Sequence, residues 1–150
     1  MASKTKLIIE YEFDTDVNNL YENFYDFRKY GQLHPFMTDV KVIEDKSPDY
    51  IEYSVCEELR LLGLIKYCPS YNVKVIEKSK YKHIIYTSQV KKGVFLTMNL
   101  YFTEDNGKTK FKEDIEVEGN KIIVSVFLKI VKNAHDKLYT IMQQRLARSN

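Results

Sequence analysis

Alternating apolar and polar residues run through most of this chain and predict strands. Residues 6–13 carry an apolar side chain at every second position, including Leu7, Ile9 and Phe13, with mostly polar residues between them. A period of two is typical of a strand with one buried face. Comparable runs, bounded by turn residues, predict further strands at 39–45, 50–59, 65–77, 82–91, 94–102 and 111–117.

Two segments repeat their apolar residues at steps of three and four, which is the spacing of one helix face. The first follows the capping group of residues 14–16 and covers residues 17–28. We expect Gly31 to break it, before a helical turn or loop at 32–37. The second, residues 121–148, predicts a helix about 40 Å long at 1.5 Å per residue. An antiparallel sheet with one apolar face needs a cover, which this helix is long enough to provide.

The composition is that of one soluble globular domain. The chain has 150 residues, of which 44% are hydrophobic and 29% charged, and this length can bury a core without disulfides or metals. No internal repeat, low-complexity run or linker divides it, so residues 1–150 are interpreted as one α+β domain. The formal net charge of +2 is spread along the chain, which offers nucleic acid no clustered positive surface.

The order of these elements and three short segments resemble the START-like helix-grip superfamily, also called SRPBCC. The segments are Tyr25-Asp26-Phe27-Arg28-Lys29-Tyr30, His34-Pro35-Phe36-Met37 and Val40-Lys41-Val42-Ile43. Within the superfamily they look most like the polyketide cyclase/dehydrase and coenzyme-Q-binding branches. The resemblance implies a curved antiparallel sheet of about seven strands wrapped around the C-terminal helix, with two short helices after the first strand.

The resemblance also implies a cavity. Members with a similar layout bind sterols, lipids, quinones, polyketides or plant hormones between the sheet and the helix, whereas a filled core is the alternative for this chain. The inward apolar alternates of the strands and the apolar face of the last helix would form the ligand-binding surface. These predicted ligand-binding residues are Tyr53, Val55, Tyr71, Val73, Met98, Leu100, Glu113, Ile115, Phe127, Val131 and Leu138.

Glu113 is the candidate catalytic residue. It shares the strand parity of Phe111 and Ile115 and is therefore expected to point inward among apolar groups. A buried carboxylate must find a partner or take up a proton, and it can then orient a ligand hydroxyl or act as a general acid. The structural alternative is a carboxylate paired with a Lys or Arg near the end of the sheet. Glu57 raises the same question on its own strand.

The histidines and cysteines do not form a recognisable reactive site. His34, His83 and His135 lack the paired spacing of a zinc site, so neither a metal nor a cofactor is predicted. We expect His34 to cap a helix or pack beside the following proline, and His135 to be half exposed. Cys56 and Cys68 are interpreted as free thiols of a reduced, cytoplasmic protein.

Three functions remain open at this point. The first is binding or transport of a hydrophobic small molecule such as a lipid, a quinone or a polyketide. The second is a cyclase or dehydratase in which Glu113, helped by Tyr53 or Tyr71, moves protons on a bound polyketide. The third is a protein-interaction module with an exposed apolar patch.

The predicted partner is therefore a hydrophobic small molecule, and the chain is expected to be a monomer or a homodimer. No apolar stretch has the length and flanks of a membrane span, so we expect no stable membrane insertion. Residues 59–65 are unusually apolar for a loop. We interpret them as a continuation of the strands, with a lid or a membrane-touching rim as the alternative.

Overall fold

The computed structural model describes residues 2–61 and 65–148. In chain order the elements are β1 (Ala2–Phe13), α1 (Val17–Tyr25), α2 (Phe27–Leu33), β2 (Met37–Lys46), β3 (Tyr50–Glu57), β4 (Leu59–Leu61), β5 (Ile65–Tyr67), β6 (Ser70–Ser79), β7 (His83–Lys91), β8 (Val94–Asp105), β9 (Lys108–Asn120) and α3 (Lys121–Arg148).

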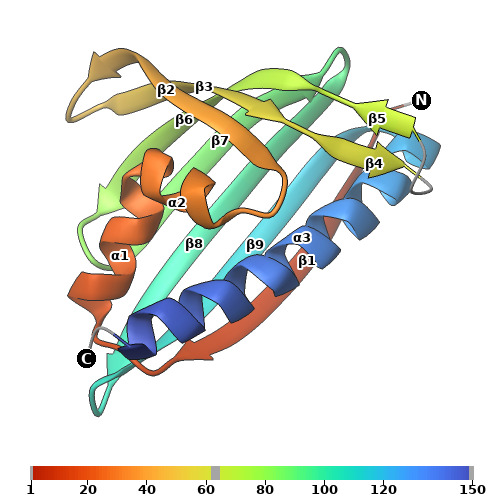
Figure 1. Cartoon of the computed structure of the whole chain (residues 1–150). Helices are drawn as coiled ribbons and strands as arrows, with labels where there is room; N and C mark the ends of the chain where they lie inside the picture. Colours follow the sequence, from red (N-terminus) through yellow and green to blue (C-terminus); the bar gives the residue numbers. More distant parts are fainter. Residues whose placement is uncertain (1, 62–64, 149–150) are drawn as a thin grey trace.

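Seven of the strands form one antiparallel sheet in the order β1-β9-β8-β7-β6-β3-β2, and β4 and β5 form a separate hairpin. Figure 1 shows α1, α2 and α3 on the same face of this sheet, with α3 running along it beside β1 and β9. The predicted helix-grip fold, its seven strands and its two short helices after the first strand are thus confirmed. Within the described residues, no helix is long and apolar enough to cross a membrane.

The break between the two short helices was predicted at the wrong residue. The interruption falls at Asp26, whose backbone N–H closes α1 on the Glu22 carbonyl oxygen at 3.1 Å and whose side chain accepts from the Arg28 N–H at 3.1 Å. Gly31 instead lies buried inside α2, where an added Cβ would stand 2.4 Å from Cγ2 of Val40. The glycine therefore serves the close approach of α2 to β2, since no larger side chain fits between them.

The predicted strands 50–59 and 65–77 are each divided in two. β3 ends at Glu57, and the chain leaves the sheet as the β4–β5 hairpin before β6 begins at Ser70. Pro69 has no backbone N–H for the ladder, which explains why a strand cannot continue through it. The strand interpretation of residues 59–65 holds for β4 and the start of β5, whereas Gly63, where a break was predicted, lies outside the described residues.

Aromatic side chains pack the core beneath the C-terminal half of α3. Phe24 of α1 stacks on Phe111 of β9 with ring centroids 4.7 Å apart, and Tyr139 of α3 meets Phe13 and Phe111 edge-on. All four side chains are fully buried or nearly so. Large rings in edge-on and stacked contact fill space efficiently, so this half of α3 is held firmly on the sheet.

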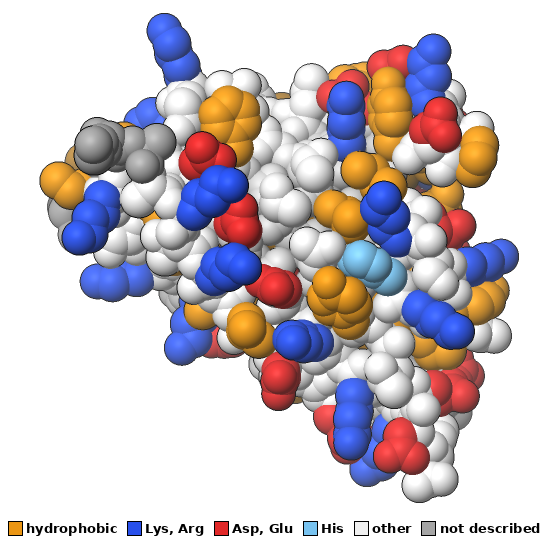
Figure 2. Space-filling view, turned by 180° about the vertical axis from the view of Figure 1, so that it is seen from behind, with side chains coloured by type: hydrophobic (Ala, Val, Ile, Leu, Met, Phe, Trp, Pro, Cys, Tyr) orange, Lys and Arg blue, Asp and Glu red, His pale blue; other side chains and the backbone are white. Residues whose placement is uncertain are grey.

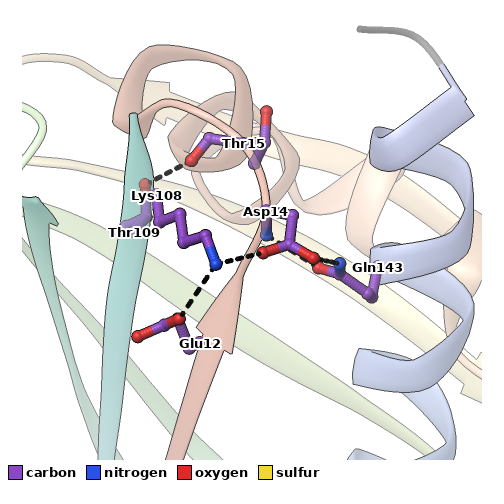
Figure 3. A network of polar contacts seen from close by, with 6 residues as sticks. All are labelled: Glu12, Asp14, Thr15, Lys108, Thr109 and Gln143. Atoms are coloured by element: carbon purple, nitrogen blue, oxygen red, sulfur yellow. Dashed lines mark hydrogen bonds and ion pairs between the residues drawn. The ribbon is translucent and has the colours of Figure 1, made fainter. Parts of the chain in front are cut away.

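Polar contacts also fix the C-terminal end of α3. The amide of Gln143 donates to Asp14 at 2.8 Å and accepts from the backbone N–H of Asp14 at 3.0 Å (Figure 3). Lys108 of the β8–β9 hairpin lies 3.4 Å from the same aspartate, and Thr109 donates to the Thr15 carbonyl oxygen at 2.9 Å. These contacts join the helix end, the β1–α1 connection and the hairpin into one cluster.

The hairpin turn generates a stability prediction. Asn106 and Gly107 have φ angles of 54° and 78° between the paired residues Asp105 and Lys108, the geometry of a type I′ turn. The substitution Gly107→Ala places a Cβ in the left-handed region and should lower the free energy of unfolding by about 1–2 kcal/mol. Asn106→Gly is the matched control and should change it little. Urea unfolding of both variants tests this, and equal stabilities would contradict it.

Candidate functional site

A cavity of about 500 Å³ lies beneath the N-terminal half of α3. Its walls come from α2, several strands of the sheet and α3, and this volume is within the range of small-molecule sites. Apolar side chains make up most of its lining, which includes Phe27, Tyr30, Val73, Tyr86, Val90, Val94, Leu96, Met98, Phe127, Ile130, Val131 and Ala134.

The size of the side chains explains why this part of the molecule is hollow. Under the C-terminal half of α3, phenylalanine and tyrosine rings from β1, β9 and α1 close the space. Under the N-terminal half, the sheet presents the shorter side chains of Val73, Val94 and Leu96. Short side chains fill less of the space between the sheet and the helix, and the cavity lies along this half of α3.

A buried polar cluster stands at the boundary between the solid core and the cavity. Nδ1 of His135 lies 2.8 Å from Oε1 and 3.0 Å from Oε2 of Glu113, and only the contact to Oε2 has hydrogen-bond geometry. The Tyr139 hydroxyl donates to the same carboxylate. On the other edge of the imidazole, Nε2 lies 3.2 Å from the Tyr30 hydroxyl. A chain of contacts thus links Glu113, through His135, to Tyr30.

The two tyrosines of this cluster act as hydrogen-bond donors. Burial, with the negative charge of Glu113 as the next cause, raises the pKa values of Tyr30 and Tyr139 well above their ordinary value. Both hydroxyls therefore keep their protons at neutral pH. The tautomer of His135 that donates from Nδ1–H to Glu113 leaves Nε2 to accept from the Tyr30 hydroxyl.

Glu57 and Tyr71 form a second polar pair in the cavity wall. The Tyr71 hydroxyl donates to Oε1 of Glu57, and both residues line the cavity. Burial raises the pKa of Glu57, although the hydrogen bond from Tyr71 opposes this by favouring the ionised form. The carboxylate is therefore easier to protonate than an exposed glutamate. Because the single O–H of Tyr71 is used on Glu57, the ionised pair offers a ligand acceptor oxygens.

His34 brings a neutral imidazole to the same cavity. It is the C-terminal cap of α2, and its Nδ1 accepts from the backbone N–H of Phe36 at 3.1 Å. The ring proton is therefore on Nε2. Burial, with a smaller effect from nearby His135, lowers the pKa of His34 from 6.5 to about 3. The predicted capping role is thus accompanied by a place in the cavity wall.

Five of the predicted ligand-binding residues line the cavity, namely Tyr71, Val73, Met98, Phe127 and Val131. Glu113 points inward as expected, but it lies behind His135 and outside the lining, and its partners are a histidine and a tyrosine rather than a Lys or Arg. The other five are buried in the core without lining the cavity, namely Tyr53, Val55, Leu100, Ile115 and Leu138. A ligand-binding role for any of these residues stays a prediction.

Sequence reasoning missed the histidine at the centre of the cluster. His135 was expected to be half exposed, but its exposed fraction is 3%, because α3 turns a wider face inward than the apolar residues alone indicate. Its spacing of four residues from Tyr139, another residue with a polar tip, was an available signal. No comparable signal identifies Tyr30, which reaches His135 from an element more than 100 residues earlier in the chain.

The neutral state of His34 predicts a pH effect on stability. Between pH 6.5 and pH 3 the unfolded chain binds a proton here that the folded chain does not, so stability falls as pH decreases through this window. The contribution is about 1 kcal/mol per pH unit. His34→Gln should remove that part of the acid loss, measured as unfolding free energy against pH. A variant with the same pH dependence as the parent chain would contradict the assignment.

Comparison with known proteins gives a fold but not a function. No protein-family profile and no curated protein matches the chain. A START superfamily protein from Mycobacterium smegmatis has a TM-score of 0.73 at 12% identity, over 97% of this chain and 99% of that one.

Two aromatase/cyclase structures are also similar. The Zhui aromatase/cyclase from Streptomyces sp. R1128 has a TM-score of 0.68 at 10% identity, over 95% of this chain and 96% of that one. The di-domain ARO/CYC StfQ of the steffimycin biosynthetic pathway has a TM-score of 0.77 at 9% identity, over 97% of this chain and 51% of that one. This chain therefore has the START-like helix-grip fold.

Proposed function

We propose that this chain binds a hydrophobic small molecule in the cavity between the sheet and the N-terminal half of α3. The observation that carries the proposal is an apolar hollow of about 500 Å³ between the sheet and α3, beside a packed aromatic core. Removing the apolar surface of a ligand from water stabilises its complex by roughly 25 cal/mol per Å². Relatives of this fold with START or cyclase names support the same class of ligand.

The polar groups of the wall favour a ligand that carries one or two oxygen atoms. Nε2–H of His34 supplies a donor, and the Glu57–Tyr71 pair supplies an acceptor. A purely aliphatic ligand would leave Nε2–H of His34 without a partner, at a cost of about 1–3 kcal/mol. A lipid, quinone or polyketide with a carbonyl or hydroxyl group matches this wall.

Two exposed thiols support a reducing compartment. Cys56 and Cys68 are both exposed and unpaired within the described residues. Exposed free thiols persist where the surroundings keep them reduced, as in the cytoplasm.

A substitution that fills the cavity should weaken binding. In the parent chain we expect N-phenyl-1-naphthylamine, a neutral apolar dye, to bind with a rise in fluorescence, because the wall excludes water. Val131→Trp adds bulk directly into the hollow and should weaken binding about tenfold or more. Leu138→Met is the matched control, since Leu138 is buried on the same helix outside the cavity and the volume is conserved. Equal affinities for the two variants would contradict the proposed site.

A second candidate function is proton transfer on an enolisable carbonyl ligand. It is supported by the contacts that run from Glu113 through His135 to Tyr30, because the last two residues line the cavity while the carboxylate stays behind them. The imidazole of His135 is oriented by the Glu113 carboxylate and is hydrogen-bonded to the Tyr30 hydroxyl at the ligand site. This is the arrangement of a general acid–base system. In this mechanism the Tyr30 oxygen takes the proton of the ligand while the Tyr30 hydroxyl proton passes to Nε2 of His135, and the reverse transfer returns it. Glu113 positions the imidazole and stabilises its charged form.

Hydrogen exchange tests this second function directly. The chain should accelerate deuterium uptake from D2O into an apolar 1,3-diketone such as 1-phenyl-1,3-butanedione, followed by mass spectrometry. Tyr30→Phe and Glu113→Gln should each slow it about a hundredfold, the usual size of one acid–base contribution. Tyr53→Phe is the control, since Tyr53 is buried beside Phe27 without lining the cavity. Exchange no faster than in buffer would leave binding as the function.

A further inference from the structure

Five exposed apolar side chains lie around one end of the molecule. We call them the rim: Ile65 and Tyr67 of β5, and Ile122, Ile123 and Val126 of α3. Their exposed fractions are 59%, 44%, 76%, 40% and 55% in that order. Single exposed apolar residues are common, but a group of this kind on two neighbouring elements marks an interaction surface.

The rim surrounds the opening of the cavity. Tyr67, Ile122, Ile123 and Val126 all line the cavity, although each is also exposed to solvent. In Figure 1 the β4–β5 hairpin departs from the sheet toward the end where α3 begins. The same apolar surface therefore continues from the ligand site to the outside of the molecule.

Positive charge accompanies the rim. Within the described residues, the segments 58–61, 65–67, 89–94 and 118–130 contain six basic residues and two acidic ones, Glu58 and Glu118. Of these cations, Lys66 alone has an ion pair within the described residues, to Glu58 at 3.6 Å. The first turn of α3 holds no acidic side chain, so the positive end of the helix dipole is not neutralised there. The basic residues are Arg60, Lys66, Lys91, Lys92, Lys121 and Lys129.

We propose that the rim docks on an anionic lipid membrane. The apolar side chains and the tyrosine of the rim would enter the boundary between headgroups and acyl chains. The lysines beside them would lie at the level of the anionic headgroups. The outer face of the sheet differs, because Figure 2 shows Lys, Arg, Asp and Glu side chains mixed there with scattered apolar ones. Docking would therefore be oriented, with the cavity opening toward the lipid.

This inference rests on the proposed ligand-binding function and adds a source for the ligand. A molecule that is poorly soluble in water would move between the lipid phase and the cavity across the rim without crossing bulk water. Neither side of the opening has to insert a helix into the bilayer, because interfacial contact by a few side chains is enough for reversible binding.

Vesicle sedimentation tests the docking. The full chain should bind vesicles of phosphatidylcholine and phosphatidylglycerol in equal parts, bind phosphatidylcholine vesicles weakly, and lose affinity at high salt. The double variant Ile122→Glu/Val126→Glu should bind about tenfold more weakly or worse, since two apolar contacts are lost. Lys91→Gln/Lys121→Gln should weaken binding to the anionic vesicles about twenty-five-fold, at roughly fivefold per cation.

The control is Ile8→Glu/Ile43→Glu, which places the same two charges at apolar positions away from the rim, exposed by 54% and 50%. Both double variants change the net charge equally. A difference in their vesicle affinity therefore reports contact of the rim with lipid rather than long-range repulsion. The Ile122→Glu substitution lies in the first turn of α3, where a negative charge is favourable to the helix dipole. Thermal unfolding midpoints equal to that of the parent chain would show that both double variants fold.

Absence of vesicle binding by the parent chain, or equal loss in the rim and control variants, would overturn the proposal. The proposal would also be overturned if the parent chain bound no vesicles but self-associated, and if the rim variant were monomeric. The rim would then be a protein interface. Dye binding measured without vesicles separates the two proposals. If the chain binds dye but no vesicles, only the docking proposal is contradicted. If it binds vesicles but no dye, the proposed ligand site is contradicted.

Discussion

A straight helix cannot stay in contact with a curved sheet along its whole length, and the arrangement of this molecule follows from that constraint. Here α3 is in tight contact over its C-terminal half, where aromatic side chains from β1, β9 and α1 fill the interface and Gln143 bonds to Asp14. The geometric mismatch is thereby shifted to the other half of α3, whose residues line the cavity. The cavity is the remaining gap, and its position depends on which half is packed.

The buried polar cluster stands where the two halves of α3 meet. Glu113 would be strongly unfavourable in this core without partners, and it receives two of them, His135 and Tyr139, from successive turns of the helix. The pairing between the carboxylate on β9 and two groups on α3 specifies how the helix is placed along the sheet. Tyr30 extends the same set of contacts to α2, so three elements around the cavity are held in register by one network.

The period of the apolar residues predicted the strands, the long helix and the inward side of β9. This was possible because an element with one buried face repeats its apolar residues at the period of its own geometry. It could not separate core from cavity. Met98 and Leu100 have the same parity on β8, yet one lines the cavity and the other does not. That distinction depends on how far α3 stands from each point of the sheet, which is a property of sheet curvature. Similarly, Gly31 resembled a helix breaker because its packing partner Val40 lies on another element.

The division of α3 into an anchored half and a half that lines the site has a consequence for evolution. Residues that determine stability, such as those around Tyr139 and Gln143, are separated along the helix from those that contact the hollow, such as Phe127 and Val131. Substitutions over the hollow can reshape it at little cost in folding free energy, since they do not disturb the packed region. The shape of the hollow can thus change while the architecture is retained, and the same fold occurs in proteins that share about one residue in ten with this chain.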